Sequence, residues 1–357
     1  MPASEIDTAA AAPHDPAAPL LLSGVPGSPY TRKMLALLRY RRIPYRLIQN
    51  SRGVPGLPAA KVPLLPTFYL PDDAGQLQAV TDSTPLIRRF EAQFAGRQAV
   101  PASPALALID ALIEDYADEW LTKAMFHYRW HCADDTEKAG LVLPYWPVGP
   151  QDDATLARNA QAARDRQMPR LRYVGSNPQT WALIEASYTR CLAILEHHLQ
   201  QHRFLLGNRP GTGDFGLFGQ LTQLTHFDPT PMALAARQAP RVIGWVGLME
   251  DHCGLEPTEA DWFDPDALPS TVSDLLHEIG RVYAPLLLAN AAALQAGQAE
   301  VHTTIDGQPW VQQAFAYQGK CLAWLRRDHQ ALAPADRAVV QRALADTGCE
   351  ALFQPPG

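Results

Sequence analysis

The hydrophobic pattern of the chain changes near residue 100, from short apolar runs to long helical stretches. The apolar run at 19–25 and the run IPYRLIQN at 43–50 are typical of short strands, and residues 28–43 between them place their apolar side chains on one helical face. Two further strands, TFYL and QLQAV, are predicted around the turn PDDAG, and residues 83–94 follow as a second helix. The predicted order is therefore β-α-β and then β-β-α.

From about residue 104 onward the apolar spacing is helical, most clearly in 105–130 and 180–202. One exception is EVHTTIDGQPWVQ, whose alternation around Asp306-Gly307 predicts a small hairpin. Residues 131–152 are rich in proline and glycine, and they are interpreted as an unusually long connection, a kind of loop that often carries function.

A parallel strand pair followed by a hairpin on one sheet is a thioredoxin-like arrangement. The expected fold class is α/β plus all-α, with a thioredoxin-like N-terminal domain followed by a larger helical-bundle C-terminal domain. We expect a disordered Ala/Pro-rich tail over 1–18, which has no signal-peptide pattern, and the thioredoxin-like domain over 19–97. The helical domain is expected over 104–357, with an extension after about 255.

Charge and cysteine usage exclude several classes of protein. The formal net charge of −7 argues against a nucleic-acid or anionic-membrane partner, and no apolar run reaches the roughly 18 residues of a membrane helix. The five cysteines are scattered, which fits a reducing compartment. His131-Cys132 and His252-Cys253 are interpreted as scattered residues and not as zinc ligands. We expect a soluble cytoplasmic protein without a metal.

The stretch GSPYTRKM at 27–34 carries the first candidate chemistry. Ser28 and Pro29 form a typical helix start, with serine as the N-cap and proline at the first helical position. Thiol-handling folds keep Cys-Pro-Tyr-Cys at this place, and here oxygens replace both sulfurs. These residues alone favour plain capping over a catalytic role.

Three stretches together resemble the glutathione transferases. They are S-P-Y-T-R-K at 28–33, K-V-P-L-L-P-T-F at 61–68 with T-D-S-T at 81–84, and FLLGNRPGTGDFGLFGQL at 204–221, with A-P-R-V-x-x-W following at 239–245. The motifs occur in the family's order and cover about 19–97 and 180–250. Residues 127–175 and the region after about 255 exceed the family's usual length.

The resemblance implies that Ser28 activates the thiol of glutathione. Lowering a thiol pKa from about 8.5 by about two units requires about 2.7 kcal/mol of preferential thiolate stabilisation. A helix N-terminus supplies roughly 0.3–1 kcal/mol, and a hydrogen bond to a charged group roughly 1.5–3 kcal/mol. The hydroxyl is therefore the larger contribution, and capping and donation are compatible. Tyr30 and Thr31 are the alternative donors.

The resemblance also implies a backbone contact to glutathione. In the family a cis-proline opens the third strand, and the residue before it pairs with the cysteinyl group. Pro63 and Pro66 both qualify, and we prefer Pro66, with Leu65 as the partner, because the strand TFYL then follows cleanly.

The remaining contacts implied by the resemblance are ionic. Asp82 would bind the γ-glutamyl ammonium, although the family more often has Glu or Gln there. Ser83 and the helix start would bind the γ-glutamyl carboxylate, whereas the residues alone indicate a turn with Ser83 or Thr84 as a cap. Arg32 or Lys61 is expected to hold the glycine carboxylate.

Two further features concern the helical domain. Asp214 resembles the family's buried helix-start carboxylate, but Gly211 stands at the cap position, so Thr212 is expected to complete the capping box. Tyr116 and Trp120 are the candidates for a pocket that binds the electrophile, although an aromatic stripe at helical spacing is more often core.

The leading hypothesis is a glutathione transferase, dimeric like its family, that delivers the thiolate of glutathione to a hydrophobic electrophilic small molecule. Glutathione acts as a co-substrate, and no metal is needed. The alternatives are a non-catalytic binding or scaffold protein of the same fold and a glutathione-dependent disulfide or peroxide reductase.

Overall fold

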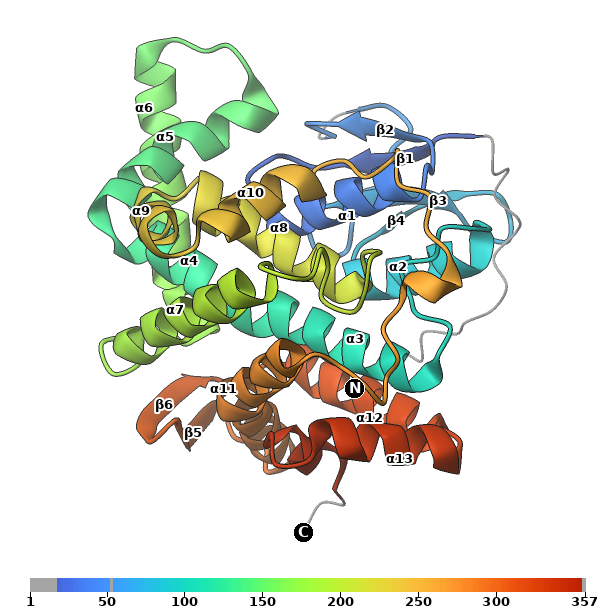
Figure 1. Cartoon of the computed structure of the whole chain (residues 1–357). Coiled ribbons are helices and arrows are strands. Elements are labelled where there is room, and N and C mark those ends of the chain that lie inside the picture. Colours follow the sequence, from blue (N-terminus) through green and yellow to red (C-terminus); the bar gives the residue numbers. More distant parts are fainter. Residues whose placement is uncertain (1–17, 52–53, 355–357) are drawn as a thin grey trace.

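The computed structural model describes residues 18–51 and 54–354, and the first seventeen residues of the predicted tail lie outside this range. Figure 1 shows a small sheet domain joined to a larger helical region. The sheet domain contains β1 (Leu20–Ser23), α1 (Pro29–Tyr40), β2 (Tyr45–Ile48), β3 (Thr67–Pro71), β4 (Leu77–Val80) and α2 (Ser83–Gln93).

The four strands form one sheet in the order β2-β1-β3-β4. Strands β1 and β2 are parallel, whereas β3 runs antiparallel to both β1 and β4. The buried side chains of this domain come from both strands and helices, among them Leu20, Leu22, Met34, Leu38, Phe68, Leu70 and Phe90. The thioredoxin-like domain predicted from the sequence is confirmed.

The helical region begins with α3 (Pro104–Tyr116), a π-helical turn η1 (Ala117–Leu121) and α4 (Thr122–His131). It continues with α7 (Trp181–His198), α8 (Thr212–His226), α9 (Pro229–Gln238) and α10 (Pro240–Met249). Helix α8 is buried along nearly its whole length and packs against α1. A Cβ atom at Gly219 of α8 would lie 2.6 Å from the Pro29 carbonyl oxygen, so this glycine lets α8 approach the start of α1.

The N-terminus of α8 is capped from another helix. Asp214 accepts hydrogen bonds from the backbone N–H of Gly211 (2.9 Å) and of Leu205 (3.0 Å). The carboxylate of Asp110 in α3 accepts from the N–H groups of Thr212 and Gly213, both at 2.9 Å, and from the Thr212 hydroxyl at 2.7 Å. The expectation that Thr212 completes the cap is wrong, because its hydroxyl is a donor to Asp110.

The region read from the sequence as a long connection is helical. Helices α5 (Ala133–Val148) and α6 (Asp153–Gln167) pack against each other and project from the molecule, and the 3-10 segment η2 (Met168–Val174) follows. The acidic residues Asp134 and Asp135 in the first turn favour the start of α5. Pro144 and Pro147 lie in its last turns, and each lacks the N–H group that would bond a carbonyl one turn earlier, so the helix ends shortly after them at Val148.

The C-terminal extension consists of α11 (Ser270–Gln295), the hairpin β5 (Glu300–Ile305) and β6 (Gln308–Gln313), α12 (Ala316–Ala331) and α13 (Pro334–Leu344). Short 3-10 segments, η3 (Glu259–Asp261) and η4 (Cys349–Phe353), flank it. The predicted hairpin is confirmed, with Asp306 and Gly307 at φ 49° and 72° in its turn. Helices α11, α12 and α13 pack against α3, which lies between the extension and the sheet domain.

Within the part of the chain that the structure describes, no helix combines the length and the apolar character needed to cross a membrane.

Candidate functional site

Ser28 lies at the N-terminus of α1, where its side chain makes two hydrogen bonds. Its Oγ accepts from the backbone N–H of Thr31 (3.2 Å), which is the predicted capping bond, and Pro29 occupies the first helical position. The same hydroxyl donates to the carbonyl oxygen of Leu65 at 3.1 Å. Ser28 therefore caps its helix and still has a proton that points away from the helix, so its two predicted roles are geometrically compatible.

The Leu65–Pro66 peptide bond is cis, which is the choice preferred over Pro63 from the sequence. Pro66 is buried, and Leu65 is 36% exposed. Thr67 opens β3, and its hydroxyl donates to the Leu64 carbonyl at 2.7 Å. The hydrogen bond from Ser28 thus joins the start of α1 to the segment that leads into β3.

The two alternative donors point into the protein. The Tyr30 hydroxyl donates to the Asp118 carbonyl oxygen (2.8 Å) and lies 3.4 Å from the Thr122 hydroxyl. Burial, together with the charges of Glu119 and Asp118, raises the pKa of Tyr30 well above its ordinary value. Thr31 is fully buried, with its side chain against Gly24. Of the three candidate donors, Ser28 is the one whose hydroxyl donates to the Leu65 segment, whereas the Tyr30 hydroxyl donates to Asp118.

Asp82 and Ser83 stand at the start of α2. The helix begins at Ser83, so Asp82 occupies the cap position that the sequence assigned to Ser83 or Thr84. The backbone of Asp82 has φ 86° and ψ 109°, a conformation that costs a non-glycine residue about 1–3 kcal/mol and is typical of functional sites. Burial raises the pKa of Asp82, although a hydrogen bond from Tyr317 opposes this effect.

Ser83 receives a hydrogen bond from a residue that the sequence analysis did not select. The buried Lys33 of α1 donates through Nζ to the Ser83 hydroxyl oxygen at 3.3 Å. It also donates to Glu114 at 2.7 Å and to Asp118 at 2.5 Å. Burial alone would lower the pKa of Lys33, but the two carboxylates outweigh burial and raise it. Lys33 is thus a fixed cation directly behind Ser83.

The sequence did hold a signal for this network. Glu114 and Asp118 are four residues apart in an otherwise apolar stretch, a spacing that places both on one helical face. Asp115 and Glu119 repeat the spacing on the neighbouring face, where Asp115 accepts from the Tyr283 hydroxyl at 2.7 Å. Burial raises the pKa of Asp115 to about 7 and of Glu119 to about 8. The sequence alone does not show which group balances the charges of Glu114 and Asp118. Their partner is Lys33, which lies in the sheet domain.

The candidates for the glycine-carboxylate contact lie apart from these residues. The guanidinium of Arg32 forms an ion pair with Glu250, which also binds Arg39. Lys61 is exposed. The structure therefore commits Arg32 to a contact between the two domains and does not bring it to Ser83, so the identity of this contact stays a prediction.

Tyr116 and Trp120, offered as pocket residues, are buried in the core at 0% and 2% exposure. Trp120 donates to the Ser187 hydroxyl at 2.6 Å, and Tyr116 packs edge-on against Tyr283. Both are structural, because solvent and ligands cannot reach a fully buried ring.

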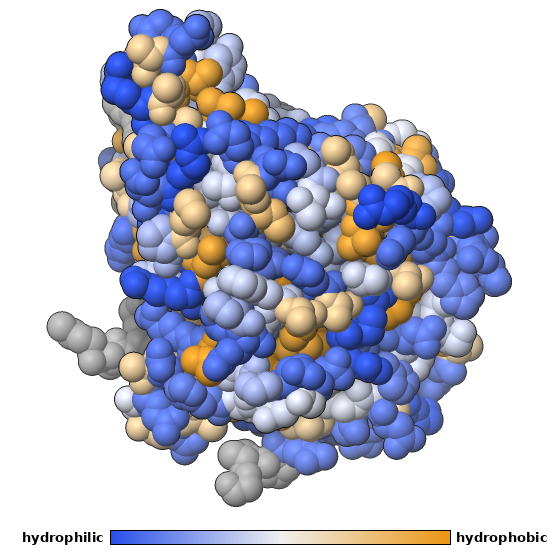
Figure 2. Space-filling view, turned by 90° about the vertical axis from the view of Figure 1, so that its left-hand side faces the viewer, coloured by the Kyte–Doolittle hydropathy of each residue, from blue (hydrophilic) through white to orange (hydrophobic). Residues whose placement is uncertain are grey.

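A different apolar surface adjoins Ser28. Leu143 and Trp146 of α5 occupy the space that a Cβ atom at Gly27 would need. Further apolar side chains of the same helix are exposed, namely Leu141, Tyr145 and Val148. Figure 2 shows apolar side chains on the projecting α5–α6 hairpin at the top of the molecule. We call Leu143 and Trp146 the wall beside Gly27. No local pattern in the sequence predicts it, because it depends on α5 folding back toward residue 27.

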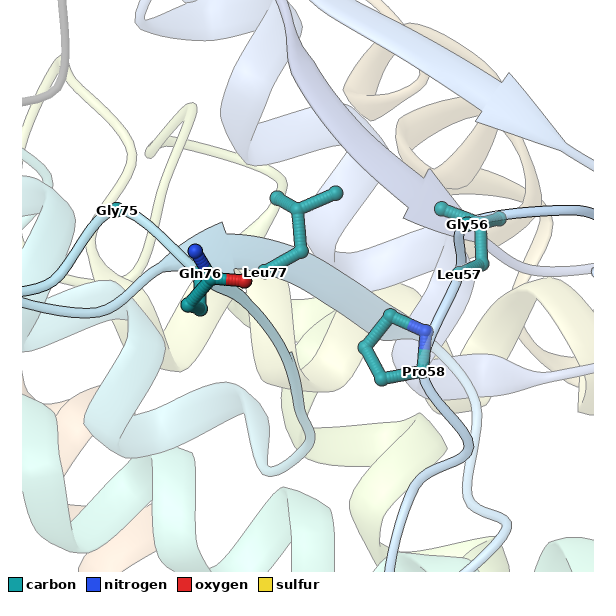
Figure 3. Close-up of a pocket in the computed structure, with 6 residues that line it drawn as sticks. All are labelled: Gly56, Leu57, Pro58, Gly75, Gln76 and Leu77. Atoms are coloured by element: carbon teal, nitrogen blue, oxygen red, sulfur yellow. The ribbon is translucent and has the colours of Figure 1, made fainter.

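A hollow of about 500 Å³ lies between the loop at 56–58 and the β3–β4 turn. Figure 3 shows its lining residues, Gly56, Leu57, Pro58, Gly75, Gln76 and Leu77. None of these six carries a charge, and none is a predicted glutathione contact. Among the described residues, the lining of this hollow therefore offers no charged group to bind glutathione.

The described residues contain no group of three or more potential metal ligands among His, Cys, Asp and Glu. His131 stacks on Trp181, with ring centroids 3.9 Å apart, and His252 packs edge-on against Phe204. Both histidines are thus engaged in aromatic contacts.

Two family models match the chain. The family described as "Glutathione S-transferase, N-terminal domain" matches residues 22–98, and "Glutathione S-transferase, C-terminal domain" matches residues 161–247. Helix α5 and the C-terminal extension lie outside both matches. A comparison with curated proteins found no significant match.

Solved structures of low sequence identity are also similar. A glutathione S-transferase from Methylobacterium radiotolerans, in complex with glutathione sulfonate, is 20% identical, with 69% of this chain and 94% of that chain covered and a TM-score of 0.39. A beta-etherase from Sphingobium is 16% identical, with 65% of this chain and 95% of that chain covered and a TM-score of 0.43. A glutathione transferase family member from Pseudomonas fluorescens, with bound S-(propanoic acid)-glutathione, is 17% identical, with 64% of this chain and 91% of that chain covered and a TM-score of 0.35.

Proposed function

We propose that the chain, whose residues 22–98 and 161–247 match the two domains of the glutathione S-transferase family, is a member of that family that binds glutathione in the sheet domain, stabilises its thiolate with Ser28 and delivers it to a hydrophobic electrophile. The observation that carries the proposal is the position of the Ser28 hydroxyl, which caps α1 and donates to the Leu65 carbonyl at 3.1 Å. A hydroxyl donor and a helix N-terminus thus adjoin the partly exposed Leu65 segment, which supports the proposed site.

The bond between Ser28 and Leu65 suggests how the donor becomes available. Leu65 is the residue that the family resemblance pairs with the cysteinyl backbone of glutathione. When the cysteinyl N–H of glutathione donates to the Leu65 carbonyl oxygen, it displaces the Ser28 hydroxyl from that acceptor. The hydroxyl then donates to the adjacent sulfur. The hydrogen bond then favours the charged thiolate over the neutral thiol, which lowers the thiol pKa.

The γ-glutamyl end is assigned to the start of α2. Lys33 can only donate, so its bond makes the Ser83 oxygen an acceptor and leaves the Ser83 proton for the γ-glutamyl carboxylate. The helix N-terminus and the nearby Lys33 charge favour the same anion. Asp82 supplies the opposite charge for the ammonium group.

The wall beside Gly27 is assigned to the electrophile. Leu143 and Trp146 adjoin Gly27, so an apolar molecule packed against them would lie next to the thiolate. Conjugation, dehalogenation, ether cleavage and isomerisation all begin with this thiolate, and the wall selects for apolar character without distinguishing between them.

A homodimer, which the resemblance implies, belongs to the same proposal. Light scattering that gives twice the chain mass would support it. The cytoplasmic location stays a prediction from the sequence.

The test is glutathione binding by calorimetry combined with ultraviolet titration of the bound thiol, in wild type and Ser28→Ala. We expect both proteins to bind and only the wild type to depress the thiol pKa. An equally depressed thiol pKa in both proteins would move the donor role to Tyr30, Thr31 or the backbone, whereas binding without any depression of the thiol pKa would favour the non-catalytic scaffold. A wild type that does not bind glutathione would exclude the proposal.

A further inference from the structure

The C-terminal extension reaches the residue assigned to the γ-glutamyl ammonium. The hydroxyl of Tyr317, in the first turn of α12, donates to Oδ1 of Asp82 at 2.7 Å. The two residues are 235 positions apart in the sequence. Residue 317 lies outside both matched family domains, so this contact belongs to a part of the chain that those domains do not include.

Tyr317 is held in place from several sides. Asn290 of α11, which is fully buried, fixes the backbone two residues earlier: its amide donates to the Phe315 carbonyl (3.0 Å) and accepts from the Phe315 N–H (2.8 Å). The Tyr317 ring packs edge-on against Trp324, with centroids 6.0 Å apart. The hydroxyl is therefore presented to Asp82 by a rigid part of the fold.

The extension also faces α2 at a second place. A cavity of about 310 Å³ is bordered by Arg88 of α2, Leu108 of α3 and Asp328 of α12, among others. Helices α2, α3 and α12 thus border one cavity, and the Tyr317 contact is made to Asp82, the residue directly before α2. Any shift of α12 would carry the hydroxyl away from Asp82.

The chemistry of this contact suits a binding carboxylate. A phenol is a neutral donor, so it orients the carboxylate without cancelling the negative charge that an ammonium group needs. Asp82 also has the unusual φ of 86°, and its short side chain has little reach. A fixed partner on Oδ1 is a way to hold such a side chain in a single direction.

We propose that Tyr317 is a positioning residue of the glutathione site, which orients Asp82 toward the γ-glutamyl ammonium and makes the C-terminal extension part of ligand recognition. This inference rests on the proposed function, because it assumes that Asp82 faces bound glutathione.

The proposal has a pH signature. Tyr317 stabilises the charged form of Asp82, so the loss of its hydroxyl raises the pKa of Asp82 further. The acid-side loss of glutathione affinity then begins at a higher pH. The other titratable groups that act on Asp82 are Lys33 from α1, Glu114 and Asp118 from the α3–η1 helix, and Cys321 from α12.

The experiment compares two ligands, glutathione and glutaryl-cysteinylglycine, which keeps both carboxylates but lacks the ammonium group. Calorimetry measures their affinities for wild type, Tyr317→Phe, Asp82→Asn and the double variant. Tyr173→Phe is the control, since it removes the hydroxyl of an exposed tyrosine in η2 that plays no part in the Asp82 contact. Thermal unfolding of each variant reports the fold.

We expect Tyr317→Phe to bind glutathione about ten-fold more weakly, as for the loss of one hydrogen bond to a charged group, and to bind the ammonium-free ligand like the wild type. In the Asp82→Asn background the same change should have little further effect. Tyr173→Phe should bind both ligands like the wild type.

Two results would overturn the inference and leave the proposed function intact: unchanged glutathione affinity in Tyr317→Phe, or equal losses for both ligands, which would indicate a structural role only. A wild type that binds neither ligand would instead overturn the proposed function, and this inference with it.

Discussion

The hydroxyl of Ser28 lies 3.1 Å from the carbonyl oxygen of Leu65 and donates to it, while its oxygen caps α1. One side chain therefore links the helix start with the cis-proline segment that precedes β3. A glutathione sulfur that accepts a hydrogen bond from this hydroxyl must compete with a backbone carbonyl, and a ligand donor that binds the carbonyl weakens this competition. Under the proposed function, glutathione binding and thiol activation would therefore depend on each other.

Ser28→Ala should affect both stability and chemistry, and the chain offers a matched control. Ser103 precedes Pro104 at the start of α3 and accepts from the Leu106 N–H, as Ser28 does from Thr31. Each alanine variant should lose about 0.5–2 kcal/mol of unfolding free energy through its lost cap. Only Ser28→Ala should raise the pKa of the bound thiol, by about one to two units, measured by ultraviolet titration. Equal thiol pKa values in the two variants would argue against a special role for Ser28.

Trp146→Ala should weaken binding of the electrophile and leave binding of glutathione unchanged. The Trp146 ring is part of the wall beside Gly27, and its removal takes away much of the apolar surface next to the thiolate. We expect KM for a hydrophobic electrophile to rise about ten-fold, with the glutathione Kd unchanged in calorimetry. Tyr145→Ala, which removes an exposed neighbouring ring, is the control. If both substitutions change KM alike, the wall has no specific role.

Two glycine substitutions should change stability in opposite directions. A Cβ atom at Gly211 would lie 2.5 Å from Oδ1 of Asp110, the carboxylate that caps α8. Gly211→Ala should therefore cost about 1–3 kcal/mol of unfolding free energy, although its φ of −95° suits alanine. Gly244 is exposed within α10, with no described atom within 4 Å of a Cβ placed there, and Gly244→Ala should stabilise by about 0.5–1 kcal/mol. Denaturant unfolding measures both, and destabilisation by both would refute the steric explanation.

His252 should make the protein less stable in acid. Burial, with the charge of Arg203, lowers the pKa of His252 to about 4 from its usual 6.5. Between these two values the unfolded chain binds the proton and the folded chain does not, so stability falls as pH drops from about 6.5 to about 4. His252→Phe keeps the ring that packs on Phe204, and it leaves no polar partner behind, since Nε2 has none among the described residues.

Thermal unfolding at pH 7.5 and pH 5 checks this prediction. The difference in Tm between the two pH values should be smaller in His252→Phe than in the wild type. His277→Gln, a change at an exposed histidine that leaves the Phe204 contact intact, should keep the wild-type difference. If His252→Phe keeps it as well, His252 does not contribute to acid sensitivity.

The local features of this protein follow from its sequence. The order of strands and helices in the sheet domain, the cap at Ser28 and the turn at Asp306-Gly307 all depend on residues that are neighbours along the chain. These features are set by local signals, namely side-chain periodicity, serine before proline and an Asp-Gly turn. Each signal acts over a few residues, so its effect can be predicted without knowing the tertiary structure. The preference for Pro66 over Pro63 succeeded for the same reason.

The tertiary structure decided the contacts between distant groups. Helix α8 is capped by Asp110 and not by Thr212, Ser83 is backed by Lys33, and Asp82 is held by Tyr317. Helix α5 continues past its prolines and brings Trp146 to Gly27. A buried charge or an unpaired N–H group needs a partner, but any suitable group nearby in space can supply it. The sequence therefore determined which groups need partners, and only the packing of the domains determined which residues provide them.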